Sequence, residues 1–98
     1  MKMKSLGFIG NFGDKTIIGG QIAKTRELYA AILRKKNVPN DVIETFLKNG
    51  ISSSKEIPDD IFVVDLKLKN PFLLFFKIVR LFSVSKNIII KWHVTKGK

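Results

Sequence analysis

The chain has 98 residues, which is enough for one domain and too few for two. Hydrophobic residues make up 45% of it, so a folded core is expected, and the lack of cysteine excludes disulfides and thiolate metal sites. The formal net charge of +10 favours polyanionic partners such as nucleic acid, anionic lipid or phosphorylated substrates, and it does not choose among them.

The first third of the chain predicts a strand, a loop and a helix. Residues 5–11 are short and apolar and are followed by glycine, which indicates a first strand. Residues 12–20 form a glycine-bearing loop, and residues 21–36 carry apolar side chains at helical spacing, with cations in the last turn. Glycines interrupt the apolar stretch after the basic N-terminus, so no signal peptide is evident and we expect a cytoplasmic protein.

The middle of the chain predicts a second helix and a second strand. Pro39 ends the first helix, because the residue before a proline is disfavoured in helical conformation. Asn40 or Asp41 can then cap a short helix that runs to about residue 49, with Gly50 as a left-handed stop. A loop over residues 51–60 leads to residues 61–65, whose β-branched and aromatic side chains on both faces are typical of a strand covered on two sides.

The last third predicts a helix rich in phenylalanine and a third strand. Asn70 is placed to cap a helix over residues 71–82, which is shorter than the about 20 residues that cross a bilayer, and residues 87–92 form the strand. Two interpretations of the helix are open. It lies in a membrane interface with Lys77 and Arg80 near lipid head groups, or it is buried between the sheet and a further layer; we favour burial, which suits an apolar helix.

This order of elements predicts an α/β fold, namely a partial Rossmann-like three-layer domain with a short parallel sheet of about three strands and helices packed on it. Successive crossovers usually place successive strands side by side, so we expect the strand order first, second, third. A parallel sheet of three strands leaves an apolar edge. We therefore expect residues 1–98 to form a single, incomplete domain that opens a larger one.

The loop and helix start are the most informative stretch. Gly19 and Gly20 allow a close approach of backbone to a ligand, and the free N–H groups at the helix start around Gln21 attract anions. Lys24 and Arg26 add positive charge within two turns, at the carboxyl edge of the sheet where such folds bind ligands. The alternative, equally open, is an ordinary strand-to-helix turn with two exposed cations.

Two further residues stand at the same edge of the predicted sheet. Asp65 ends the second strand, where a dinucleotide-binding enzyme holds a ribose hydroxyl, but the glycine spacing is not the dinucleotide fingerprint, so we favour a turn or cap role. His93 follows the third strand and is a candidate substrate contact, although an exposed bystander is the favoured interpretation. A lone histidine without cysteines or a close group of carboxylates does not support a metal site. No cofactor is expected either, and no catalytic group is identified.

Two segments resemble the start of GT-B-type glycosyltransferases, in particular bacterial enzymes that assemble surface polysaccharides. Residues 8–12 read Phe-Ile-Gly-Asn-Phe, and residues 19–26 read Gly-Gly-Gln-Ile-Ala-Lys-Thr-Arg. The later elements follow a similar order. Two features depart from the family: residues 38–60 are longer than a direct helix-to-strand link, and the donor-binding C-terminal domain is not within the sequence.

The resemblance implies the acceptor-side portion of an enzyme of the hexosyltransferase type, inactive alone. That enzyme would transfer a sugar from a nucleotide-sugar donor, held by the missing domain, to a polysaccharide or lipid-linked acceptor. Gly19, Gly20 and Gln21 would line the interdomain cleft, with Lys24 and Arg26 near it. The implied location is the cytoplasm, with peripheral contact at the inner face of the plasma membrane.

The alternative function is a small basic, non-enzymatic module that binds nucleic acid or another polyanion. The net charge supports it. Against it, the aromatic residues lie within apolar segments instead of alternating with cations as a base-stacking surface requires. No helix-turn-helix or RNA-recognition motif occurs either, so nucleic acid is the less favoured partner.

Overall fold

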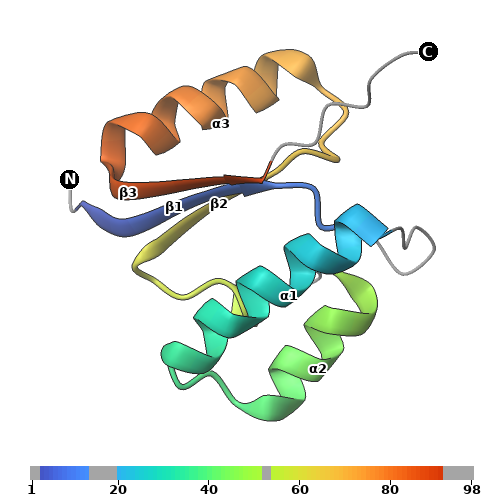
Figure 1. Ribbon diagram of the computed structural model, residues 1–98. Coiled ribbons are helices and arrows are strands. Elements are labelled where there is room, and N and C mark those ends of the chain that lie inside the picture. The colour runs from blue at the N-terminus through green and yellow to red at the C-terminus, as the bar shows by residue number, and fades with distance from the viewer. Residues whose placement is uncertain (1–2, 14–19, 52–53, 92–98) are drawn as a thin grey trace.

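The computed structural model shows a parallel sheet of three strands (Figure 1). Strand β1 (Lys4–Gly10) lies in the centre, between β2 (Ile61–Asp65) and β3 (Ser85–Lys91), and pairs with both in parallel. The structure describes residues 3–13, 20–51 and 54–91.

Helices cover both faces of this sheet. Figure 1 shows α1 (Gly20–Lys35) and α2 (Asn40–Asn49) on one face and α3 (Pro71–Val84) on the other. A short 3₁₀ turn, η1 (Ser54–Glu56), precedes β2. The α/β class, the three layers and the parallel direction predicted from the sequence are therefore confirmed.

The expected strand order was wrong, because β1 and not β2 is central. The connection through α1 and α2 runs over one face from β1 to β2, and α3 returns over the other face, past β1, to β3 (Figure 1). Crossovers of the same hand on opposite faces must move in opposite directions along the sheet. The order β2-β1-β3 is that of a common doubly wound fold, in which the ligand crevice opens between the carboxyl ends of β1 and β3.

The main core lies between the sheet and the pair α1 and α2. Its centre is a group of four buried aromatic rings, whose contacting centroids lie 5.2–5.6 Å apart: Phe8, Phe12, Tyr29 and Phe46. Most of these contacts are edge-to-face, the geometry that aromatic quadrupoles favour. Because the rings come from β1, the turn after it, α1 and α2, this cluster fixes both helices on the sheet.

A smaller core lies under α3. Leu81 packs there with Ile9 and Val64, which point to the opposite face from Phe8 as strand alternation requires. Gly7 permits the close approach of the helix, since a Cβ at this position would lie 2.5 Å from Ser85 Oγ and 2.7 Å from the Leu81 side chain.

Several predicted element ends are confirmed. The bounds of β2 and the end of α2 agree with expectation, and Gly50 ends α2 with φ 78°. The side-chain cap expected at the start of α2 was wrong, because Pro39 takes the N-cap position and the helix start has no side-chain capping hydrogen bond. The Asn70 side chain accepts hydrogen bonds from the backbone N–H groups of Phe72 and Leu73, at 3.0 and 3.2 Å, which is the expected cap. β3 begins earlier than predicted, because α3 runs directly into it, and the predicted end of this strand at residue 92 lies outside the described residues.

Candidate functional site

Asp65 ties together the carboxyl ends of β1 and β2. Its Oδ1 accepts hydrogen bonds from the backbone N–H of Lys67 at 3.1 Å and from that of Phe12 at 3.4 Å. The backbone N–H of Leu66 also donates to the carbonyl of Gly10 at 2.9 Å. Asp65 thus fills the turn role that the sequence favoured for it, and in addition it positions the turn that follows β1.

The second oxygen of Asp65 is buried and accepts no hydrogen bond from the described residues. The ammonium group of Lys67 lies 3.7 Å from it and donates instead to the carbonyl of Gly13, at 3.0 Å. Burial raises the pKa of the Asp65 carboxyl, although the backbone N–H and ammonium groups of Lys67 and the N–H of Phe12 oppose part of this rise. Lys67 was not among the site residues predicted from the sequence. A lysine two residues after an acidic residue that ends a strand is the pattern that could have indicated it.

The start of α1 presents an exposed backbone at the same end of the molecule as the carboxyl end of β1 (Figure 1). Gly20, Gln21 and Lys24 are exposed there, and the first turn holds no acidic side chain that would compensate the positive end of the helix dipole. A Cβ at Gly20 would meet no atom within 4 Å. The space beside this residue is therefore open, as the ligand-binding interpretation requires.

Arg26 is buried, with 2% of its surface exposed. Its Nε donates to the carbonyl of Phe12 at 2.7 Å, and its Nη1 donates to the carbonyls of Leu47 and Lys48 at 3.0 and 3.2 Å. These bonds join the turn after β1 to the C-terminus of α2, where carbonyl groups lack helical partners. The expectation of two exposed cations in this stretch is correct for Lys24 and wrong for Arg26.

Gly10 is explained by packing. A Cβ on it would lie 2.9 Å from the methyl group of Thr25 and 3.0 Å from the ring of Phe8. The buried Thr25 side chain also bonds back to the carbonyl of Gln21, at 3.0 Å. Glycine at position 10 therefore lets α1 lie close against the end of β1, which places the helix start beside the turn.

Two of the predicted site residues, Gly19 and His93, lie outside the described residues. Their suggested ligand contacts stay predictions, as do those of Gly20, Gln21 and Lys24, whereas the buried Arg26 side chain is directed to backbone carbonyls of the chain itself. Within the described ranges, no group of three or more potential ligands is placed to hold a metal ion. No helix in that part of the chain is long and apolar enough to cross a bilayer.

The opposite, amino end of the sheet has a shallow hollow of about 300 Å³, lined by Met3, Lys4, Asp59 and Asp60. The Asp60 carboxylate there is already paired, since it accepts hydrogen bonds from Lys36 and from the Ser5 hydroxyl. These hydrogen bonds, that of Lys36 above all, lower the pKa of Asp60. The hollow thus lies away from the ligand edge of the fold and its carboxylate has partners within the chain.

The fold defines the chain as a doubly wound, partial Rossmann-like α/β domain, with open space beside Gly20 at the start of α1. Neither protein-family models, nor curated proteins, nor solved structures give a significant match to the chain.

Proposed function

We propose that the chain is the N-terminal, acceptor-side portion of a GT-B-type glycosyltransferase. The reaction is transfer of a sugar from a nucleotide-sugar donor to a polysaccharide or lipid-linked acceptor, at the cytoplasmic side of the membrane. The observation that carries the proposal is the open backbone at Gly20, at a positive helix end whose first turn holds no acidic side chain, on the carboxyl edge of a doubly wound sheet.

The described residues divide into two roles in this proposal. Gly20, Gln21 and Lys24 are exposed and contact the acceptor across the cleft. Arg26 and Asp65 hold the turn after β1 in place from behind, through their hydrogen bonds to Phe12. A second domain supplies the donor site and closes the cleft, which orients both substrates and excludes water. The purified chain is therefore expected to bind acceptor without turnover.

Amide chemical-shift mapping of the isotopically labelled chain tests this function. Short glycans and nucleotide sugars are titrated in turn, and the amides of residues 20–24 are expected to shift most with a glycan. Gly20→Ala should weaken that binding at least severalfold without loss of fold, because the added methyl group meets only open space. Lys24→Ala should weaken it as well.

Lys35→Ala provides the matched control, because Lys35 is an exposed cation in the last turn of the same helix. It should leave glycan binding unchanged. Shifts that involve other surfaces alone, or equal effects of Lys24→Ala and Lys35→Ala, would remove the support for a cleft at this edge. Turnover of a nucleotide sugar by the purified chain would contradict the need for a second domain.

A further inference from the structure

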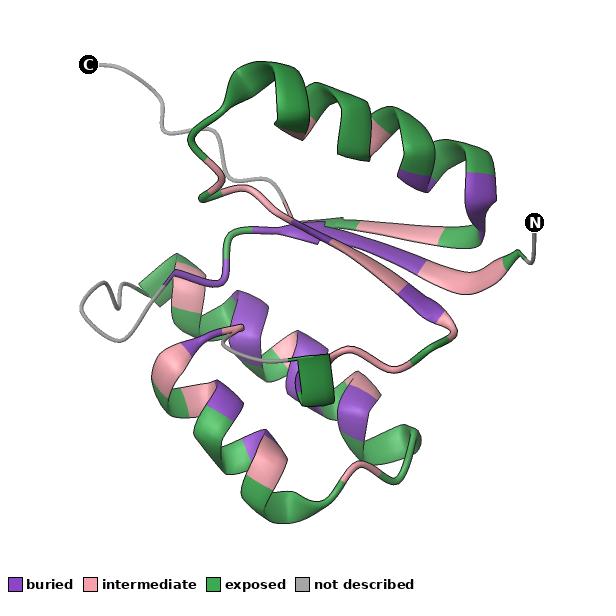
Figure 2. Ribbon diagram, turned by 180° about the vertical axis from the view of Figure 1, so that it is seen from behind, coloured by how far each residue is buried: buried purple, intermediate pink, exposed green. Residues whose placement is uncertain are grey.

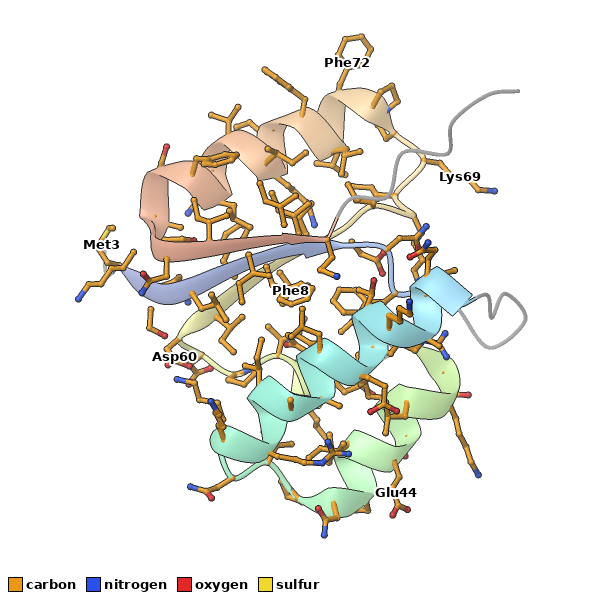
Figure 3. All side chains as sticks on the ribbon, viewed as in Figure 1. Met3, Phe8, Glu44, Asp60, Lys69 and Phe72 are labelled. Atoms are coloured by element: carbon orange, nitrogen blue, oxygen red, sulfur yellow. The ribbon has the colours of Figure 1, made fainter. Side chains whose placement is uncertain are left out.

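The outward face of α3 is apolar and exposed. Leu74, Ile78 and Leu81 pack against the sheet, whereas the opposite side of the helix carries large apolar side chains in contact with solvent. Figure 2 shows the exposed outer surface, and Figure 3 shows Phe72 pointing away from the sheet. This face consists of Phe72, Leu73, Phe75, Phe76, Val79 and Phe82, with Phe72 86% and Phe75 69% exposed. The expected contact of this helix with the sheet is confirmed, and the further layer expected over its outer side stays a prediction.

These side chains form one continuous stripe. Phe72, Phe75, Phe76 and Val79 stand at the helical spacings of three, four and seven residues, so they share one side of α3. The helix has 14 residues and is about 21 Å long, which is less than the about 30 Å of a bilayer core. It is too short to span the core, and its apolar side is suited to lying in the plane of an interface.

Charge along the chain is strongly divided. All eight acidic residues lie within the first 65 positions, and residues 66–98 hold eight lysines and arginines with no Asp or Glu. Of these cations, Lys77 is exposed on α3, beside the apolar stripe, and Lys69 is exposed just before the helix cap. These two exposed lysines favour an occupant that carries negative charge over a neutral one.

We propose that the outward face of α3 docks onto an anionic phospholipid surface. The phenylalanine rings enter the boundary between head groups and acyl chains, while the flanking lysines contact lipid phosphates. A second copy of this chain is a poorer occupant, because its own acid-free segment would bring cations against cations. The inference does not depend on sugar transfer and stands or falls separately from the proposed function.

Co-sedimentation of the purified chain with vesicles tests this inference. Binding is expected to vesicles that contain phosphatidylglycerol, and to be at least tenfold weaker with phosphatidylcholine alone. Phe72→Gln with Phe76→Gln should reduce binding tenfold or more, because both rings are exposed and neither belongs to the core under the helix. Circular dichroism should show the fold of this variant to be unchanged.

A pair of charge variants separates local contact from net charge. Lys69→Gln with Lys77→Gln should weaken binding by about fivefold for each cation removed. Lys35→Gln with Lys48→Gln lowers the net charge equally, on helices that cover the other face of the sheet (Figure 1), and should change binding less than twofold. An equal loss of vesicle binding in both double variants, or equal binding to anionic and neutral vesicles, would overturn the proposal. So would the absence of vesicle binding together with a dimer that requires Phe72 and Phe76.

Discussion

Asp65 organises the carboxyl ends of β1 and β2, and its partly buried carboxylate is electrostatically unfavourable when ionised. One oxygen holds two backbone N–H groups, and the other is buried without a hydrogen-bond donor among the described residues. An ionised carboxylate in such a place is less stable than in water. The carboxyl group that positions the turn after β1 is therefore one whose protonated form the fold favours.

We expect Asp65→Asn to change the pH dependence of stability in a defined direction. Because the pKa of Asp65 in the fold lies above its ordinary 3.8, the native chain binds this proton more tightly than the unfolded chain. The stability that protonation contributes is present at low pH and is lost as the pH rises through the raised pKa. Asparagine does not titrate. The free energy of unfolding of the variant should therefore increase relative to that of the wild type as the pH rises above 3.8. Urea unfolding across a pH series measures this.

Asp60→Asn is the matched control for that experiment. Its pKa is lowered by the Lys36 and Ser5 hydrogen bonds, so its contribution is present at higher pH and is lost as the pH falls through the lowered pKa. The variant should therefore lose stability relative to the wild type as the pH rises, opposite to Asp65→Asn. Parallel pH profiles for the wild type and Asp65→Asn would contradict the burial argument.

The Tyr29 hydroxyl links the aromatic cluster to the segment before β2. It donates to the carbonyl of Glu56 at 2.7 Å, and both residues are buried. Tyr29→Phe keeps the ring contacts and leaves this carbonyl without its donor, which should cost about 1–3 kcal/mol in the free energy of unfolding. Denaturant titration at neutral pH measures the change, and an unaltered midpoint would show that water replaces the hydroxyl without loss.

At the scale of elements, local patterns predicted what each segment forms and did not predict how segments meet. The ends of β2 and α2 and the Asn70 cap follow from alternation, glycine and proline placement and capping chemistry, all of which are local. The strand order depends on which face α3 takes, and no local pattern encodes this. Arg26 has a helical position typical of an exposed cation, and its burial depends on the carbonyls of α2, more than 20 residues away.

The contact between α3 and β1 should tolerate no side chain at position 7. Gly7→Ala places a methyl group against Ser85 and Leu81 at distances that require a shift, so we expect a loss of about 1–3 kcal/mol in stability. Gly20→Ala is the matched control, because its methyl group meets nothing within 4 Å, and it should change stability by about 1 kcal/mol or less. Thermal and urea unfolding compare the two, and equal effects would show that α3 adjusts freely.

At the scale of the whole molecule, the larger core and the exposed apolar stripe lie on opposite faces of the sheet. α1 and α2 enclose the larger core, and the acid-free segment that follows β2 carries the exposed stripe. Exposed apolar patches of this kind mark interaction surfaces. Because the cations of this segment act on any polyanion, nucleic acid is a necessary comparison for the lipid surface.

Nucleic acid should bind weakly, without sequence preference and with a steep salt dependence. No described element is suited to reading base edges, so counterion release supplies the affinity. Fluorescence anisotropy with several unrelated oligonucleotides across a salt series measures this, with Lys24→Ala and Lys35→Ala as a pair of exposed single-charge variants. Both variants should lower affinity equally. Tight binding of one oligonucleotide sequence at physiological salt, lost in Lys24→Ala but kept in Lys35→Ala, would favour the alternative function of a nucleic-acid-binding module.

Because α3 runs directly into β3, we expect these two elements to unfold together. Val84 ends the helix and Ser85, already extended with ψ 135°, begins the strand, so no loop separates them. The helix rests on the smaller core, and β3 lies at the edge of the described sheet, where it pairs with β1. Neither can leave the sheet without pulling on the other. In native-state hydrogen exchange, their amides should therefore lose protection together, as one cooperative unit below the global unfolding free energy, while the aromatic half of the molecule stays closed.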